Sequence, residues 1–149
     1  MKFLVPDSIY YTCKPGEEKL PLGDYLGDLT DELADYGAGS YLTEFISAGP
    51  KNYCYKIFGT KDQQIHTVIK VKGHTLDYNT MKNVNSDEMR KMVFAFVQAK
   101  QQKEVTVVTP RIVRVDHHKV VTRLVRKVYR VVYDKRVVLD DFTTIPYGY

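Results

Sequence analysis

The feature that most constrains the fold is a pair of valine-rich segments in the last third of the chain. Residues 104–115 read EVTVVTPRIVRV, and residues 119–139 read KVVTRLVRKVYRVVYDKRVVL. Valine at many alternate positions is the period-two pattern of a β-strand, and β-branched side chains favour strands. The short polar stretch 116–118 separates the two segments, so we expect the chain to turn there. Basic residues are distributed through both segments.

Two hairpins and one further strand are expected earlier in the chain. Residues 2–13 hold two short apolar runs broken by Pro6-Asp7-Ser8, and both proline and Asp-Ser favour a turn. The apolar runs 41–47 and 52–58 flank a tight Ala48-Gly49-Pro50-Lys51 connection, which is typical of a hairpin. The β-branched alternation that begins at residue 65 predicts a strand that ends at Gly73.

Two segments carry helical signals. Leu22, Leu26, Leu29 and Leu33 recur at helical spacing, which predicts an amphipathic helix whose leucines face the core. Residues 86–100 predict a second helix, because they open with Ser86, have acidic residues in the first turn and end with Lys100. Its apolar face contains Met89, Met92, Val93, Phe96 and Val97.

The order of these elements indicates an α+β fold instead of a βαβ alternation. We expect an antiparallel sheet with one packing helix in residues 1–73, followed by a small β-rich lobe with one helix in residues 74–149. The boundary falls after Gly73, where the polar segment HTLDYNTMKNVN begins.

Length and composition narrow the class of protein. The chain has 149 residues, of which 44% are hydrophobic and 27% charged, so a globular fold is expected. No apolar run approaches the roughly 20 residues of a membrane span, and no secretory signal is visible, which predicts an intracellular protein without a membrane partner. Cys13 and Cys54 lie in apolar strand patterns, so we expect buried free thiols and neither a disulfide nor a zinc site.

Charge is distributed unevenly along the chain. Residues 1–50 contain three lysines and nine Asp or Glu residues, whereas residues 51–149 contain nineteen Lys or Arg residues and nine acidic residues. An asymmetry of this size indicates a polyanionic partner for the basic part. A solvated surface that keeps the protein in solution is the alternative.

Two short motifs in the basic part carry residues suited to phosphate. Strand alternation places Lys51, Tyr53 and Tyr55 on one face, and a cation beside phenols can hold a phosphate and the adjoining sugar. Lys70 and Lys72 repeat this arrangement before a glycine, where a ligand can approach the backbone closely. Tyrosines on a half-buried strand also serve as ordinary packing, so this pattern alone leaves both interpretations open.

A longer pattern resembles a known family. The pieces DSIYY, KPGEEKLPLGDYLGDLTDEL, YLTEFISAGPKNYCYK, VIKVKGHTL and YDKRVVLDDFTTIPYGY occur in this order. Together they resemble the extreme C-terminal part of protein-primed family B DNA polymerases, most closely those of Polinton (Maverick) transposons and their viral relatives. The resemblance covers essentially the whole chain. It implies that residues 1–73 correspond to the end of the polymerase palm and residues 74–149 to a thumb-like subdomain, which grips the duplex product through its backbone.

The resemblance also implies that the catalytic metal turn is degenerate. The family carries Asp-Thr-Asp-Ser at the tip of a palm hairpin, and Val5-Pro6-Asp7-Ser8 stands at that place. Val5 replaces the first Asp, a ligand of the catalytic magnesium ions, and a hydrocarbon side chain offers none of the oxygen ligands that magnesium requires. The family's second acidic motif, nucleotide-binding lysine, fingers and exonuclease domain all precede this hairpin. We therefore expect no catalytic activity and no cofactor.

The remaining motifs imply DNA binding. The family's Lys-x-Tyr motif, which contacts the primer strand, matches Lys51-Asn52-Tyr53, and its lysine-bearing strand resembles Lys70-Val71-Lys72-Gly73. We expect a domesticated or decayed remnant, nuclear if it is a host protein, that binds duplex or primer-template DNA through phosphates regardless of sequence. The expected contacts are Lys51, Tyr53, Lys70, Lys72, Arg111, Arg114, Arg123, Arg126, Lys127 and Arg130.

Other functions stay open at this point. A protein-interaction or homo-oligomerisation module is the main alternative, because a truncated palm leaves open strand edges that can pair with a partner. An enzyme assembled with a second chain that supplies the missing carboxylates is another. Metal sites lack a supporting spacing, and turns or solvated surface explain their residues better. The candidates are Asp116-His117-His118, the aspartates Asp28, Asp31 and Asp35, and His66 and His74 with Cys54 or His118.

Overall fold

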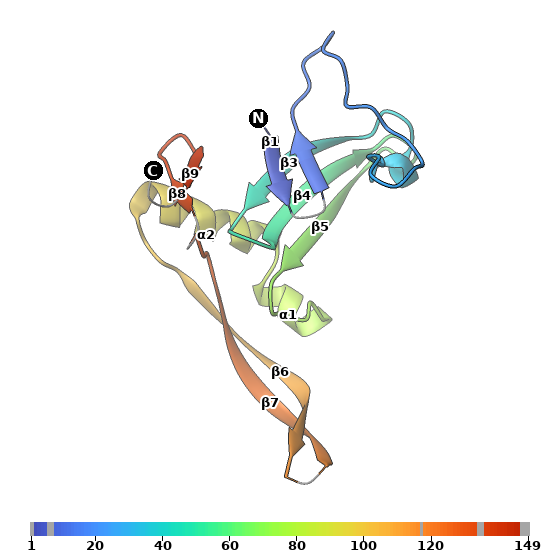
Figure 1. Cartoon of the computed structure of the whole chain (residues 1–149). Helices are drawn as coiled ribbons and strands as arrows, with labels where there is room; N and C mark the ends of the chain where they lie inside the picture. Colours follow the sequence, from blue (N-terminus) through green and yellow to red (C-terminus); the bar gives the residue numbers. More distant parts are fainter. Residues whose placement is uncertain (1, 6–7, 117, 134–135, 147–149) are drawn as a thin grey trace. The chain divides into compact units, whose positions relative to one another are not determined.

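The computed structural model describes residues 2–5, 8–116, 118–133 and 136–146 (Figure 1). Within these residues, strands and two α-helices form the α+β fold that the sequence predicts. The chain forms two compact units, Met1–Thr43 with Lys56–His66 and Glu44–Tyr55 with Thr67–Tyr149. The units divide the chain elsewhere than at Gly73, and the palm and thumb assignment stays a prediction.

The first unit begins with the expected hairpin. Strands β1 (Lys2–Val5) and β2 (Ser8–Tyr11) pair antiparallel, with the last residue of β1 opposite the first of β2. Pro6 and Asp7, at the expected turn, lie outside the described residues. Beyond β2 the chain is mostly loop up to the short 3-10 helix η1 (Ala34–Tyr36).

The prediction of an amphipathic helix around Leu22 and Leu26 is wrong. The segment is a loop, and these two side chains are 61% and 107% exposed. The Asp28 carboxylate accepts a hydrogen bond from the Tyr25 backbone N–H at 3.0 Å, and Gly27 has a φ of 98°. Asp competes with the helical ladder for backbone N–H groups, and a glycine inside a helix costs about 1 kcal/mol. The turn preferences of Asp28 and Gly27 therefore outweigh the helical spacing of the leucines. Loop and the short helix η1 stand in place of the packing helix expected in residues 1–73.

A three-stranded sheet follows, with strand order β3-β4-β5. Its strands are β3 (Tyr41–Ser47), β4 (Asn52–Gly59) and β5 (Gln64–Val71). The turn between β3 and β4 is the expected tight connection, in which the Asn52 N–H donates to the Gly49 carbonyl oxygen at 3.0 Å. Glycine is required at position 49, because its φ is 122° and an added Cβ would lie 1.9 Å from the Val132 carbonyl oxygen.

Both α-helices of the described residues belong to the second unit. Helix α1 (Tyr78–Asn83) is absent from the sequence-based prediction, and the Asp77 carboxylate caps it by accepting a first-turn backbone N–H. Helix α2 (Ser86–Ala99) confirms the predicted helix. Its cap is the Asn85 side chain, one residue before the predicted start.

Two hairpins complete the second unit. Strands β6 (Glu104–Val115) and β7 (Lys119–Arg130) form one long antiparallel hairpin, which we call the ribbon (Figure 1). The valine alternation predicted both strands and the turn between them, of which His117 lies outside the described residues. The shorter hairpin consists of β8 (Arg136–Val138) and β9 (Thr144–Pro146).

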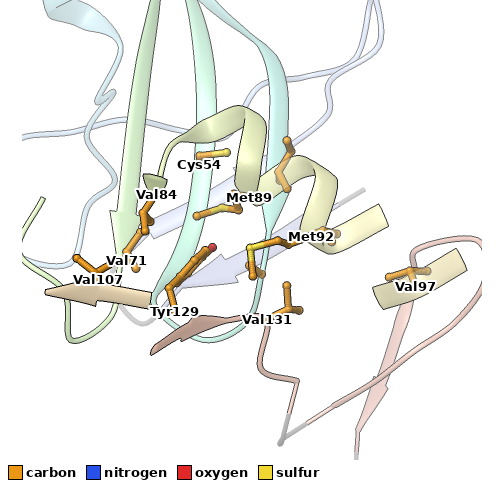
Figure 2. Close-up of a cluster of buried hydrophobic side chains, with 12 residues drawn as sticks. Cys54, Val71, Val84, Met89, Met92, Val97, Val107, Tyr129 and Val131 are labelled. Carbon is orange, nitrogen blue, oxygen red and sulfur yellow. The ribbon is translucent and has the colours of Figure 1, made fainter. Parts of the chain in front are cut away.

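The hydrophobic core of the second unit gathers around α2 (Figure 2). Met89 and Met92 of the helix, which are 0% and 1% exposed, lie close to Tyr129 at the base of the ribbon. Burying such a side chain stabilises a fold by about 1.5–3 kcal/mol. The other labelled members of this cluster are Cys54, Val71, Val84, Val97, Val107 and Val131.

The two cysteines differ in environment. Cys54 is buried in the core as expected, but the prediction that Cys13 is buried is wrong. Cys13 lies in an exposed loop beyond the end of β2, where its Sγ contacts the Glu17 carbonyl oxygen at 3.5 Å. Both are free thiols. None of the described helices combines the length and apolar composition needed to cross a bilayer.

Candidate nucleic-acid interface

The ribbon has two chemically different faces, because residues directly opposite each other in an antiparallel pair point to the same side. We call the side of its odd-numbered residues the covered face and the side of its even-numbered residues the open face. On the covered face, Val107 and Tyr129 are 4% and 2% exposed and belong to the core. Every residue of the open face is exposed to solvent. One whole side of the ribbon is therefore available to a partner.

The ribbon is strongly basic. Its two strands contain a single acidic residue, Glu104, against seven Lys or Arg residues. The register places Arg114, Arg126 and Arg130 on the open face and Arg111, Lys119, Arg123 and Lys127 on the covered face. The DNA-binding residues predicted for this segment therefore do not form one row, because the pleat separates them into two sets.

Two covered-face cations hold the turn that follows β5. The Arg111 guanidinium donates through Nη2 to the Gly73 carbonyl oxygen at 3.1 Å, and the Lys127 ammonium donates to the same oxygen. Gly73 has a φ of 78°, so the chain turns sharply at this point, as expected from its glycine. Arg111 and Lys127 thus have a structural role that the sequence did not indicate. We call this arrangement the Gly73 clamp.

A pocket of about 210 Å³ lies in the second unit, at the base of the ribbon. It is lined by segments far apart in the sequence, including Pro50, Asn52, Lys72, His74, Tyr129 and Arg130. Two of these side chains are cations, and the lining contains no carboxylate. Glu104 pairs with Arg130 at 3.7 Å, but both side chains are more than half exposed, so water screens this attraction. We call this site the basic pocket.

Three buried polar atoms among the lining residues lack a well-aligned hydrogen bond within the described structure, although the Asn52 side chain and the Tyr129 hydroxyl lie close enough to interact. They are Asn52 Oδ1, His74 Nε2 and the Tyr129 hydroxyl. The other polar atom of Asn52 donates to the Ala48 carbonyl oxygen at 3.2 Å, and His74 Nδ1 lies 3.2 Å from the Lys72 carbonyl oxygen. Since a carbonyl only accepts, the Nδ1 carries the proton. Burial raises the pKa of the Tyr129 phenol, so this hydroxyl keeps its proton and can donate.

Lys51 lies in the β3–β4 turn, between Pro50 and Asn52, which both line the pocket. Lys51 is exposed in the turn itself with a φ of 56°, and it precedes the first residue of β4 instead of lying on the strand face. Lys70 is also exposed, at the end of β5, but it does not line the pocket. Lys51 and Lys70 remain predicted DNA contacts.

Tyr53 packs against other aromatic rings. Its ring stacks on Phe45 at 5.8 Å and on Tyr55 at 6.3 Å between centroids, which makes a row of three aromatic rings on β3 and β4. The expected sharing of one strand face by Tyr53 and Tyr55 is therefore confirmed. A half-buried ring in such a row contributes about 0.5–1.5 kcal/mol beyond its area, which gives Tyr53 a reason to be present that is independent of DNA.

The turn that we predict to be a degenerate metal site falls partly outside the described residues. Val5 pairs with Ser8 along the backbone of the first hairpin, and Asp7 lies outside the described residues. The Ser8 hydroxyl donates to the Glu32 carboxylate at 2.8 Å. Of the residues proposed as metal ligands, His66 lies 2.8 Å from Asp62. Across the described part of the chain, no three His, Cys, Asp or Glu side chains gather into a metal-binding group.

The site combines cations, hydrogen-bond donors and an open basic strand surface, which is a suitable arrangement for oxyanions such as phosphate. Sequence reasoning found Lys72 and Arg130 but missed Asn52 and His74 as pocket residues. The strand alternation that put Asn52 opposite Tyr53 was the available signal for the first. Nothing in the sequence places His74 beside Tyr129, because that contact depends on tertiary packing. No protein-family model, curated protein or solved structure matches the chain.

Proposed function

We propose that this chain binds DNA through the phosphate backbone, regardless of base sequence, and that it is a catalytically inactive relative of the palm and thumb of protein-primed family B DNA polymerases. One observation carries the proposal. Lys72 and Arg130, from separate basic motifs, line the same pocket, and the β3–β4 turn that contains Lys51 also contributes Pro50 to its lining. Residues expected to contact phosphates are thus brought together by the fold.

Electrostatics supports a polyanionic partner. The ribbon carries seven cations against one carboxylate, and every residue of its open face is exposed. Cations that neutralise DNA phosphates release condensed counterions, which makes such binding favourable at low salt and steeply weaker as salt rises. A basic ribbon beside a carboxylate-free pocket is therefore expected to prefer DNA over neutral partners.

The dimensions of the ribbon also support DNA. Two strands of twelve residues each extend over roughly 40 Å at about 3.4 Å per residue. This length matches about twelve base pairs at the axial rise of B-form DNA. Known β-ribbon and β-sheet proteins place strands in the major or the minor groove of DNA, so a ribbon with an exposed face is a suitable element to approach a duplex.

The cations are expected to differ in their contribution. Arg111 and Lys127 are engaged in the Gly73 clamp, and we assign them to stability. The others are exposed and available to phosphates. We assign DNA contact to Lys51, Lys70, Lys72, Arg114, Arg126 and Arg130, whereas Arg123, on the covered face, stays a predicted contact.

We propose that the chain is catalytically inactive because of the side chain at one position. Val5 stands where the related polymerases carry the first Asp of their metal turn, and an isopropyl group cannot ligate magnesium. Two-metal phosphoryl transfer depends on such carboxylates. Nucleotide incorporation on a primed template by the purified chain would contradict this part of the proposal.

The proposal is tested by fluorescence anisotropy with two unrelated 20-base-pair duplexes over a salt series. We expect equal Kd values within a few-fold and a slope of log K against log salt of up to about −5, because six phosphate contacts contribute about −0.9 each. Lys72→Ala should weaken binding of both duplexes, whereas Lys61→Ala, an exposed lysine of the first unit, should leave it unchanged. Binding that survives high salt unchanged would count against the proposal.

A protein-interaction module remains the second candidate function. The observation that favours it is the presence of large aliphatic side chains on the exposed face of the ribbon, such as Ile112 and Leu124. Exposed apolar patches commonly mark interfaces between proteins, including homo-oligomers. Light scattering coupled to size exclusion separates the candidates, since a stable oligomer without DNA affinity would support this function.

A further inference from the structure

The open face of the ribbon is apolar as well as basic. Ile112 and Leu124 are 77% and 74% exposed, and Val108, Val120 and Val128 are between 44% and 57% exposed. Single exposed aliphatic side chains are common on protein surfaces, but five on one face of one hairpin form a patch that calls for a partner. Phosphate contact alone does not explain them, because aliphatic groups gain nothing from an anion.

The strand register orders this patch. Leu124 lies opposite Pro110, and Ile112 lies opposite Thr122, so the most exposed aliphatic groups occupy the middle of the open face. Arg126, opposite Val108, and Arg114, opposite Val120, lie on either side of them. Positions 108 and 114 are separated by roughly 20 Å along the strand. The face therefore has an apolar centre between two cations.

This pattern is complementary to the minor groove of DNA. The floor and walls of that groove present base edges and sugar carbon atoms, and phosphates border it on both sides. All charged residues of the open face are arginines except Glu104, which lies at the end of the ribbon opposite Arg130. An acidic protein surface would satisfy the arginines, but it would have to supply a matching apolar strip between its acids.

We propose that the open face of the ribbon enters the DNA minor groove and bends the duplex, with Ile112 and Leu124 wedged against the base steps. This inference rests on the proposed DNA binding and adds the groove and the deformation to it. Apolar side chains inserted between base steps unstack them at a cost of a few kcal/mol, which the closer wrapping of the bent duplex offsets. DNA that is already easy to kink should therefore bind more tightly than a stiff duplex.

The test is a bending assay on a 20-base-pair duplex labelled at both ends with a fluorescence energy-transfer pair. We expect the intact chain to raise the transfer efficiency on binding. Ile112→Ser combined with Leu124→Ser should abolish the rise and weaken binding about tenfold, while the slope of log K against log salt stays the same, because no phosphate contact is removed. A duplex with a central unpaired base should bind more tightly to the intact chain only.

Matched control variants distinguish loss of the apolar wedge from loss of the fold. Ile65→Ser changes a half-exposed isoleucine of the first unit and should leave affinity and bending unchanged. Leu124→Phe keeps an apolar wedge and should retain bending, so a loss caused by misfolding is distinguished from a loss of the wedge. Far-ultraviolet circular dichroism and the melting temperature establish that each variant is folded.

The outcomes separate this inference from the proposed function. Binding without bending by the intact chain, or bending unaffected by the double serine variant, would overturn the groove inference and leave phosphate binding in place. Absence of binding to any DNA at low salt would overturn both. A double serine variant that dissociates an oligomer and leaves DNA binding unchanged would assign the apolar face to a second copy of the chain, against this inference.

Discussion

The two faces of the ribbon share the same strands and both contain several apolar side chains, yet their environments differ. On the covered face, Val107 and Tyr129 lie in the core, whereas on the open face Ile112 and Leu124 lie in solvent. Alternation in a sequence identifies two faces of a strand but does not say which one is buried when both are apolar. The difference therefore points to a requirement other than folding for the open face.

The cations follow the same division. Arg111 and Lys127 on the covered face donate to the Gly73 carbonyl oxygen, and Arg126 and Arg130 on the open face extend from exposed positions. Among the described residues, Arg126 donates to the neighbouring Thr106 hydroxyl, at 3.4 Å. We therefore expect substitutions on the covered face to lower mainly the free energy of unfolding, and substitutions on the open face to lower mainly the affinity for DNA.

The largest expected effect is loss of stability from the covered face. Tyr129→Ala removes a 2% exposed ring from the core and should lower the free energy of unfolding by about 3–5 kcal/mol, measured by urea denaturation. Leu124→Ala on the open face should change it by less than about 0.5 kcal/mol. Equal losses in the two variants would show that the two faces contribute alike to the stability of the fold.

High pH should also destabilise the second unit. Burial raises the pKa of Tyr129 and Tyr133 well above the usual value near 10. Because the folded pKa exceeds the unfolded one, the stability from these phenols is complete below about pH 10 and falls as pH rises beyond it. Melting temperatures measured between pH 8 and pH 11.5 should decline steeply above pH 10.

Phenylalanine variants provide the control for this titration. Tyr133→Phe removes a phenol that donates to the Ser47 carbonyl oxygen, and Tyr129→Phe removes a buried phenol that lies beside the Asn52 side chain. The double variant should show a shallower decline above pH 10, while Tyr25→Phe, at a residue that is 86% exposed, should reproduce the profile of the intact chain. An unchanged decline in the double variant would contradict the assignment.

A smaller loss is expected at the Gly73 clamp. Lys127→Met removes one of two donors from the Gly73 carbonyl oxygen and should lower the free energy of unfolding by about 1 kcal/mol. Arg123→Met, a cation on the same face without such a contact among the described residues, should have a smaller effect. Urea denaturation of both variants measures the difference, and the opposite order would show that the clamp does not support the corner.

The sequence predicted those parts of the fold whose signal is local. The valine alternation identified β6, β7 and their turn, and the Ala48-Gly49-Pro50-Lys51 segment identified the β3–β4 hairpin. The helix from Ser86 was predicted because apolar spacing and end residues agreed. In each case propensity, pattern and turn chemistry supported the same structure, which is the condition under which sequence reasoning succeeds.

The errors arose where propensity, pattern and turn chemistry favoured different structures. Leucine spacing outweighed glycine and aspartate signals around Gly27 in the prediction, while the reverse holds in the structure. Helix α1 is too short for a periodic pattern, and only Asp77 indicated its start. In the site, the individual cations were predictable, but the approach of Lys72 to Arg130 and the clamping of Gly73 depend on tertiary packing.

The most direct test of the account compares the salt dependence of DNA binding in two paired variants. Arg126→Gln with Arg130→Gln removes two open-face charges, and Arg111→Gln with Lys127→Gln removes two covered-face charges. The account predicts that the first pair makes the slope of log K against log salt less steep by about 2, whereas the second leaves the slope of the folded protein unchanged. Equal changes of slope in both pairs, or no change in the first, would contradict it.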